Sequence, residues 1–230
     1  MKISAIVVAA GSSRRMGTDK LWLPLLGRPV IAHCLRALQG CVEVAEVIVV
    51  TREEARSRLE ALAIAEGISK LAKILPGGAE RQDSVWRGLQ AGGAGCDLAL
   101  IHDAARPMVT VEIVRRVACA ALEFGSAVCG APVTDTIKEI DADQWVVRTP
   151  PRNTLMAVQT PQIFRRDLIV DCYRRWIEEG ALATDDTAVA EHYGHRVKVV
   201  SCPEPNLKVT HPGDIEVIEL LGRLKSSAAQ

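Results

Sequence analysis

ISAIVVAAGSSRRMG, residues 3–17, joins an apolar run directly to a loop of small residues and arginines. The run Ile3 to Ala9 has the length and the β-branched content of a buried strand. At the carboxyl end of a parallel strand, backbone N–H groups of a small-residue loop can approach phosphate oxygens without obstruction. Arg14, Arg15 and the nearby Lys20 supply cations for such a cradle. The stretch therefore predicts a phosphate site, although a tight turn with solvated arginines has the same composition.

The first half of the chain continues as an alternation of strand-like and helical segments. Helical patterns occupy residues 30–40 and 53–66, and further strand-like runs are Ala45 to Thr51, Lys73 to Leu75 and Leu98 to Ile101. This alternation is typical of a parallel sheet covered by helices. The first loop is neither G-x-G-x-x-G nor G-x-x-x-x-G-K-[ST], which disfavours dinucleotide-dependent dehydrogenases and P-loop proteins.

The second half contains an interruption of this pattern. After a helix at residues 112–124 and a strand at 127–131, the runs Thr136 to Ile140 and Trp145 to Thr149 predict an antiparallel hairpin. Helices are then expected at residues 167–179 and from Thr184, followed by a strand at 196–201 and a terminal helix. We predict one domain over residues 1–230, with residues 134–152 projecting from it as a β-arm.

Composition narrows the range of functions. The 230 residues include 28 Lys+Arg and 28 Asp+Glu, so no net positive charge steers the whole protein to nucleic acid or to an anionic membrane. No apolar run approaches the roughly 20 residues that a membrane helix needs. The seven cysteines form no C-x-x-C pair, which is typical of reduced core residues in a cytoplasmic protein.

A second chemical signal follows the strand Leu98 to Ile101. His102-Asp103-Ala104-Ala105-Arg106-Pro107 puts a carboxylate at the same rim of the sheet as the small-residue loop. Asp103 at this position can hold Mg²⁺ against phosphate oxygens. Alternatively, Asp103 caps a turn and pairs with Arg106.

Several motifs occur together in one order along almost the whole chain. They are residues 9–16, Lys20 with Leu23-Pro24-Leu25, residues 77–85, His102 to Pro107, residues 131–136, Thr160-Pro161-Gln162, Thr184-Asp185-Asp186 and residues 206–210. In this combination the sequence resembles the 2-C-methyl-D-erythritol 4-phosphate cytidylyltransferase family of the non-mevalonate isoprenoid pathway. The resemblance implies a Rossmann-like, doubly wound α/β fold of the nucleotide-diphospho-sugar transferase type.

The resemblance also implies roles for individual residues. Arg15 and Lys20 correspond to the pair that stabilises the α-phosphate of CTP in the transition state, and Asp103 corresponds to the Mg²⁺ ligand. The cytosine and ribose correspond to a site formed by Ala9, Ala10, Gly11, Gly78, Ala79 and Ser84. The acceptor, a small sugar-alcohol phosphate, corresponds to a site formed by Arg106, Thr136, Arg152, Thr160 and Lys208. Arg152 and Lys208 are also expected in catalysis, and the hairpin resembles an arm that embraces the second subunit of a homodimer.

The sequence departs from the family pattern at two positions. Ser13 stands where members commonly carry a second glycine, and Asp19-Lys20-Leu21 replaces the usual P-K-Q. The second departure places an anion beside the expected catalytic lysine.

Two other functions stay open at this point. A ribitol-5-phosphate cytidylyltransferase, or a related sugar-phosphate nucleotidyltransferase, would share the fold, the loop and the acidic metal ligand. A non-catalytic nucleotide-binding module would share the sheet, but nucleotide binding alone does not need both Lys20 and Arg15 on one side and Arg152 and Lys208 on the other.

Overall fold

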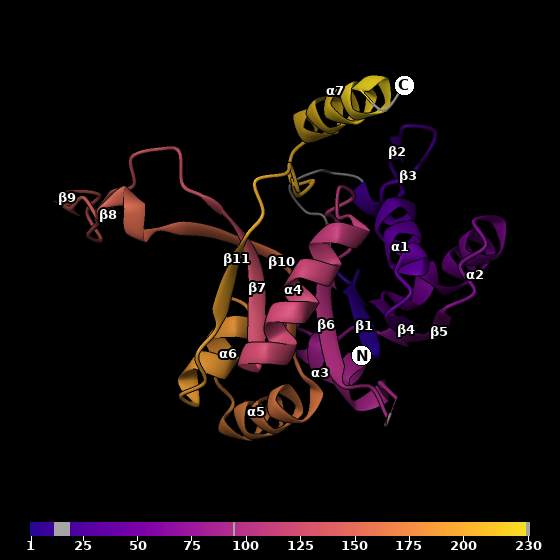
Figure 1. Cartoon of the computed structure of the whole chain (residues 1–230), viewed down its shortest axis with the longest axis horizontal. Helices are drawn as coiled ribbons and strands as arrows, with labels where there is room; N and C mark the ends of the chain where they lie inside the picture. Colours follow the sequence, from indigo (N-terminus) through magenta and orange to yellow (C-terminus); the bar gives the residue numbers. More distant parts are fainter. Residues whose placement is uncertain (12–18, 94, 229–230) are drawn as a thin grey trace.

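A central sheet runs through the protein in the order β11-β7-β10-β6-β1-β4-β5 (Figure 1). The computed structural model describes residues 1–11, 19–93 and 95–228. All strands of this sheet are parallel except β10, which pairs antiparallel with both β6 and β7. The predicted mostly parallel sheet is therefore confirmed. The strands are β1 (Ile3–Val8), β4 (Val44–Thr51), β5 (Leu71–Pro76), β6 (Leu98–Asp103), β7 (Ser126–Pro132), β10 (Met156–Arg165) and β11 (Lys198–Ser201).

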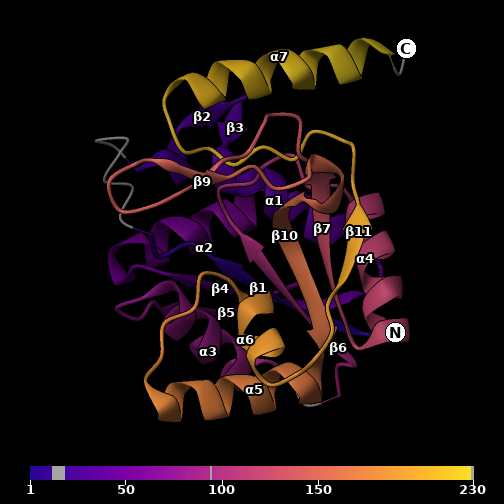
Figure 2. The same cartoon turned by 90° about the vertical axis from the view of Figure 1, so that its left-hand side faces the viewer.

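Helices cover both faces of the sheet (Figure 2). Ile3, Ala5 and Val7 of β1 point to one face, and Ile6 points to the other, so the strand is buried on both sides. This double burial is the reason that parallel strands read as continuous apolar runs. One face carries α1 (Val30–Gly40), α2 (Arg56–Ala65) and α4 (Val111–Phe124), and the other carries α3 (Arg81–Ala91), α5 (Arg166–Glu179) and α6 (Asp186–His192).

The order of the strands creates a crevice beside β1. From β1 the chain passes to β4 and β5 on one side of the sheet, and β6 then pairs with the other side of β1. Such a reversal of strand order opens a space outside the carboxyl ends of the two adjacent strands. The loop after Val8 and the side chain of Asp103 stand at these two ends.

Strand β10 is absent from the prediction made on sequence alone. Its segment contains Gln159-Thr160-Pro161-Gln162, and internal proline and polar residues usually exclude a central strand. The pairing with β7 is irregular between Val158 and Gln162, which accommodates the proline. Thr160 and Gln162 are buried and hydrogen bonded to other elements, so tertiary contacts override the local pattern here.

The predicted arm leaves the sheet after β7 and returns in β10, and Figure 1 shows it extending away from the body. It contains β8 (Glu139–Ile140), β9 (Val146–Arg148) and the 3-10 turn η4 (Arg152–Thr154). The two paired strands are shorter than the predicted runs Thr136 to Ile140 and Trp145 to Thr149. Trp145 is 74% exposed in the isolated chain.

Other differences from the prediction are local. The helical segment expected from residue 53 divides into the 3-10 turn η3 (Glu53–Ala55) and α2, and α6 takes Asp185 rather than Thr184 as its N-cap. The cysteines are free thiols, and most are buried. In the part of the chain that the structure describes, no helix has both the length and the apolar character required to span a bilayer.

The chain ends in α7 (Gly213–Ala228), which lies over the short hairpin of β2 (Pro24–Leu25) and β3 (Arg28–Pro29) (Figures 1 and 2). Ile218 packs with Leu25 and Val30 in a small cluster separate from the two main ones. The 3-10 turn η2 (Lys20–Trp22) precedes this hairpin and is held by Leu21, which is 6% exposed.

Candidate active site

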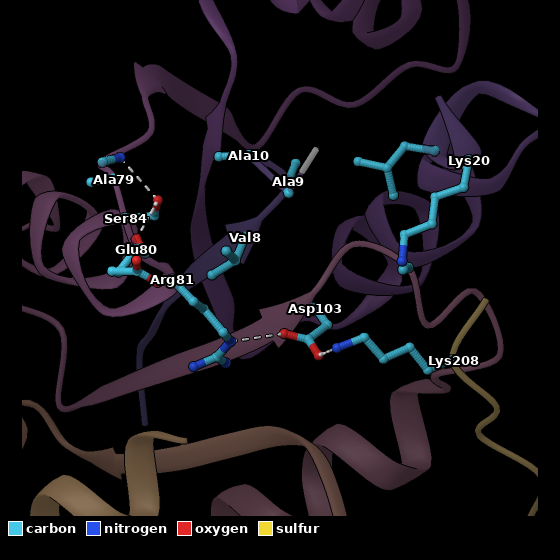
Figure 3. Close-up of a pocket in the computed structure, with 14 residues that line it drawn as sticks. Val8, Ala9, Ala10, Lys20, Ala79, Glu80, Arg81, Ser84, Asp103 and Lys208 are labelled. Atoms are coloured by element: carbon cyan, nitrogen blue, oxygen red, sulfur yellow. Dashed lines mark hydrogen bonds and ion pairs between the residues drawn. The ribbon is translucent and has the colours of Figure 1, made fainter. Parts of the chain in front are cut away.

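A cavity of about 400 Å³ occupies the crevice beside β1 (Figure 3). In this view Lys20 lies across the cavity from Ala79 and Ser84, and Asp103 lies between Arg81 and Lys208. Nine of the residues assigned to a site from the sequence line this one cavity: Ala9, Ala10, Gly11, Lys20, Gly78, Ala79, Ser84, Asp103 and Lys208. Arg15 lies outside the described residues.

The loop after β1 and the loop before α3 are in close contact. A side chain at Gly77 would place its Cβ 2.3 Å from the Cβ of Ala10, and one at Gly78 would place it 2.1 Å from the Cβ of Asp83. Both distances are shorter than any real carbon contact, so only glycine fits at these positions. The two loops therefore form one wall of the cavity, in which Gly11, Gly78 and Ala79 leave the backbone accessible to a ligand.

The start of α3 forms the far side of this wall. Glu80 is the N-cap, and its side chain and that of Asp83 form a reciprocal capping box. The Ser84 hydroxyl accepts a hydrogen bond from the Gly78 N–H at 3.1 Å, which fixes the preceding loop. The amino end of a helix carries a partial positive charge and favours anions, so this end of the cavity suits phosphate.

Asp103 holds the centre of the opposite wall. Its Oδ1 accepts a hydrogen bond from Arg81 Nε at 3.2 Å, and its Oδ2 accepts one from Lys208 Nζ at 2.6 Å. Burial alone raises the pKa of this carboxyl group, but Arg81 and Lys208 outweigh burial and hold the pKa well below its usual range. The carboxylate is thus ionised and is paired with these two cations rather than with the Arg106 side chain.

Arg81 is a site residue to which the sequence analysis assigned no role. Its guanidinium donates to both carboxylate oxygens of the fully buried Asp186 at 3.0 and 2.8 Å, and Tyr173 Oη donates to the same carboxylate at 2.6 Å. Burial lowers the pKa of Arg81, but Asp186 and Asp103 raise it above its ordinary value. In the sequence, the signal for this role was that Arg81 and Asp186 belong to two of the motifs, residues 77–85 and 184–186.

His102 and Thr160 lie behind Asp103 and hold its turn in place. Thr160 Oγ1 accepts from the Asp103 N–H at 3.0 Å and lies 3.0 Å from His102 Nδ1. His102 Nε2 lies 3.2 Å from the carbonyl oxygen of Arg106. Burial lowers the pKa of His102 to about 4. A neutral ring that donates from Nε2 and accepts the Thr160 hydroxyl proton at Nδ1 satisfies all three contacts.

The remaining predicted acceptor residues do not line the cavity. Arg106 donates from Nη1 to the Asn206 carbonyl oxygen at 2.8 Å, and Thr160 is 4% exposed. Thr136 and Arg152 are exposed on the arm, where Arg152 Nη1 donates to the Thr134 carbonyl oxygen at 2.7 Å. Within the described part of one chain, the structure therefore brings together Lys20 and the residues predicted for the cytosine and ribose, but not the complete set predicted for the acceptor.

The carboxylate of Asp103 lines the cavity and is of a type that suits Mg²⁺. Magnesium is commonly held by one or two carboxylates together with substrate phosphates, rather than by a cage of protein ligands. No cluster of three or more His, Cys, Asp or Glu side chains suitable for a metal occurs among the described residues. A single carboxylate beside the cationic groups fits a magnesium ion that arrives with a nucleotide.

A doubly wound sheet with this cationic cavity at its switch point defines a nucleotide-binding α/β protein. Comparison with known proteins identifies the particular group. Residues 3–223 match the family described as IspD, 2-C-methyl-D-erythritol 4-phosphate cytidylyltransferase. The chain belongs to this family.

Individual relatives match this chain over at least nine-tenths of their own length. The chain is 40% identical over 226 residues to the 2-C-methyl-D-erythritol 4-phosphate cytidylyltransferase of Caldanaerobacter subterraneus, covering 97% of this chain and 100% of the relative. It is 42% identical to that of Symbiobacterium thermophilum, covering 95% and 92%. Among solved structures, the Thermus thermophilus enzyme has a TM-score of 0.78 at 33% identity, with 97% and 100% coverage. The 4-diphosphocytidyl-2C-methyl-D-erythritol synthase of Anaerococcus prevotii has a TM-score of 0.86 at 28% identity, with 96% and 98% coverage.

Proposed function

We propose that this chain transfers the cytidylyl group of CTP to 2-C-methyl-D-erythritol 4-phosphate and releases pyrophosphate. The observation that carries the proposal is the cavity in which Ala9 to Gly11 and the start of α3 face Lys20, Asp103 and Lys208. Membership of the cytidylyltransferase family supports the same reaction. The product is 4-diphosphocytidyl-2-C-methyl-D-erythritol, a precursor in isoprenoid synthesis.

The reaction joins two anions, and the cavity has the charges to oppose their repulsion. An oxygen of the acceptor phosphate attacks the α-phosphorus of CTP, the bond to the bridging oxygen of the β-phosphate breaks, and pyrophosphate leaves with the electron pair. Lys20 and Arg15 would stabilise the charge that develops on the α-phosphate, and Lys208 would orient the incoming phosphate. The attacking oxygen is already ionised near neutral pH, so no general base is needed.

Magnesium is part of the proposal as a cofactor. Asp103 would hold the ion, which when bound supplies charge neutralisation and Lewis-acid polarisation at the phosphates. The contacts of Asp103 with Arg81 and Lys208 keep the carboxylate ionised and correctly placed. Lys208 is 39% exposed and can exchange its contact with Asp103 for one with a substrate phosphate.

We also propose that the chain forms a homodimer through the arm. Arg152 and Thr136 lie on a projecting hairpin and do not line the cavity of their own chain. The hairpin also exposes large apolar side chains, with Val146 58% and Val147 60% exposed. Apolar surface of this kind is typical of a protein contact. Arg152 and Thr136 would therefore complete the acceptor site of the second copy.

The identity of the acceptor distinguishes the proposal from its nearest alternative. Purified protein with CTP and Mg²⁺ is offered 2-C-methyl-D-erythritol 4-phosphate and ribitol 5-phosphate in parallel, and pyrophosphate release is measured. We expect turnover with the methylerythritol phosphate. Faster turnover with ribitol 5-phosphate would show that the acceptor is assigned incorrectly.

A further inference from the structure

An ion pair between Asp19 and Arg52 lies immediately before the lysine of the proposed site. Arg52 Nη2 donates to Asp19 Oδ2, and the two side chains are 42% and 28% exposed. Arg52 directly follows β4, whereas Asp19 is the residue before the turn η2 that carries Lys20. Asp19 is also one of the two positions at which this chain departs from the family pattern. The pair therefore joins a rigid strand of the sheet to the segment that places Lys20.

The other end of η2 is held independently. Leu21 is buried in the main core, and the Trp22 ring packs under the guanidinium of Arg58 at 4.1 Å from the ring centroid. Within the turn, the Trp22 N–H donates to the Asp19 carbonyl oxygen at 3.0 Å. The carboxyl side of Lys20 is thus fixed by packing, and the Asp19 contact with Arg52 restrains its amino side.

The backbone at Asp19 has the shape that a proline would impose. Its φ is −74° and its ψ is 92°, and a proline ring holds φ near −65 ± 15°. Among the described residues, the Asp19 N–H has no hydrogen-bond acceptor, so a proline there would remove no contact that the structure shows. A ring or a side-chain ion pair can therefore produce the same local geometry by different means.

We propose that Arg52 is a positioning residue that acts through Asp19 to fix the turn carrying Lys20. The ion pair does in this chain what a proline ring would do at residue 19. This inference rests on the proposed function, because it assigns Lys20 to the transition state. Exposed ion pairs contribute little to global stability, so the effect is expected in the placement of Lys20 rather than in the unfolding of the protein.

The experiment compares kcat and KM of the full-length protein with those of Arg52→Ala, the charge-exchanged pair Asp19→Arg with Arg52→Asp, and Asp19→Pro combined with Arg52→Ala. Arg56→Ala is the matched control, because Arg56 lies on the same segment and makes a 2.8 Å ion pair with the exposed Glu53. We expect Arg52→Ala to lower kcat about tenfold with little change in KM, a loss within the range of couplings between contacting residues. Charge exchange and the proline should each recover most of the loss.

Two kinetic results would overturn the inference. Activity of Arg52→Ala equal to that of Arg56→Ala would show that the pair positions nothing. A loss in Arg52→Ala that neither charge exchange nor Asp19→Pro recovers would show that Arg52 contacts substrate directly.

Hydrogen exchange tests the same restraint without any substrate. The Trp22 amide, which donates to Asp19, should exchange faster in Arg52→Ala and return to the wild-type rate with Asp19→Pro. Unchanged exchange in Arg52→Ala would contradict the restraint. A wild-type protein that makes no pyrophosphate would instead refute the proposed function, while the exchange rates would still decide whether Arg52 holds the turn.

Discussion

Replacing Asp103 with asparagine removes the charge at the centre of the site and keeps the shape of the side chain. Asp103 accepts one charge-assisted hydrogen bond from Arg81 and one from Lys208. Hydrogen bonds to charged groups contribute about 1 kcal/mol more than neutral ones, so two contacts give about 2 kcal/mol. Lys208 is 39% exposed and its share is screened by solvent, which leaves about 1.5 kcal/mol. For a chain of this size, the melting temperature should fall by about 3–6 °C.

The rate should fall much further than the stability. Loss of one preorganised electrostatic group at a transition state costs about a hundredfold to a thousandfold in kcat. We would measure thermal unfolding without ligand and the Mg²⁺-dependent rate of pyrophosphate release, with Asp171→Asn on the exposed face of α5 as the control. An Asp103→Asn protein with the calculated loss of stability and a nearly normal rate would refute the catalytic role and leave Asp103 as a structural residue.

The difference in stability between wild type and Asp103→Asn should depend on pH in a direction set by the pKa of Asp103. The pKa of Asp103 is lower in the folded protein than in the unfolded chain, so its stabilisation is complete above the unfolded pKa of about 3.9. This stabilisation is lost as the pH falls toward the lower folded value. The difference in melting temperature between wild type and Asp103→Asn should thus be constant above about pH 5 and shrink in acid. A difference that grows in acid would contradict the assigned charge state.

Lys20→Ala should raise the activation free energy by about 2–4 kcal/mol and lower kcat accordingly. An unchanged kcat would show that Lys20 has no role in the mechanism. If the arm crosses to the partner, mixing inactive Arg152→Ala and Lys20→Ala proteins forms hybrid dimers with one intact site, and about a quarter of wild-type activity should return; verified subunit exchange without recovery would place Arg152 in its own site. His102 should stay neutral to about pH 4, because burial lowers its pKa. The stability that depends on this shift is complete above pH 6.5 and declines in acid, and ring ¹⁵N shifts that titrate near pH 6.5 would show that His102 is accessible to water.

The sequence alone predicted the alternating strands and helices of the core, and it predicted that the loop after β1 and Asp103 border one site. Residues 3–7 and 98–101 are buried in a parallel sheet that is covered on both faces, so their apolar runs predicted strands correctly. The small-residue loop and Asp103 follow these runs directly, which placed them at one edge.

The remaining features depend on contacts between distant segments. Strand β10 carries buried polar residues that only their partners explain, since Gln162 Oε1 accepts from the backbone of Asp186 and Thr187 at the start of α6. Arg81 and Asp186 are 105 positions apart in the chain, and no local pattern indicates that they meet. Arg152 lies on the exposed arm, away from the cavity of its own chain, so neither the sequence nor the fold of a single chain shows which site it would serve.

Cytidylyl transfer breaks the bond in CTP between the α-phosphorus and the oxygen that bridges to the β-phosphate. Phosphorus NMR of a mixture of protein, CTP, Mg²⁺ and 2-C-methyl-D-erythritol 4-phosphate observes all the phosphates directly. We expect the monoester signal of the acceptor to disappear as free pyrophosphate and a new diphosphate diester appear in equal amounts. Formation of CDP with orthophosphate or with a doubly phosphorylated acceptor would show cleavage at the γ-phosphate, and would contradict cytidylyl transfer by this site.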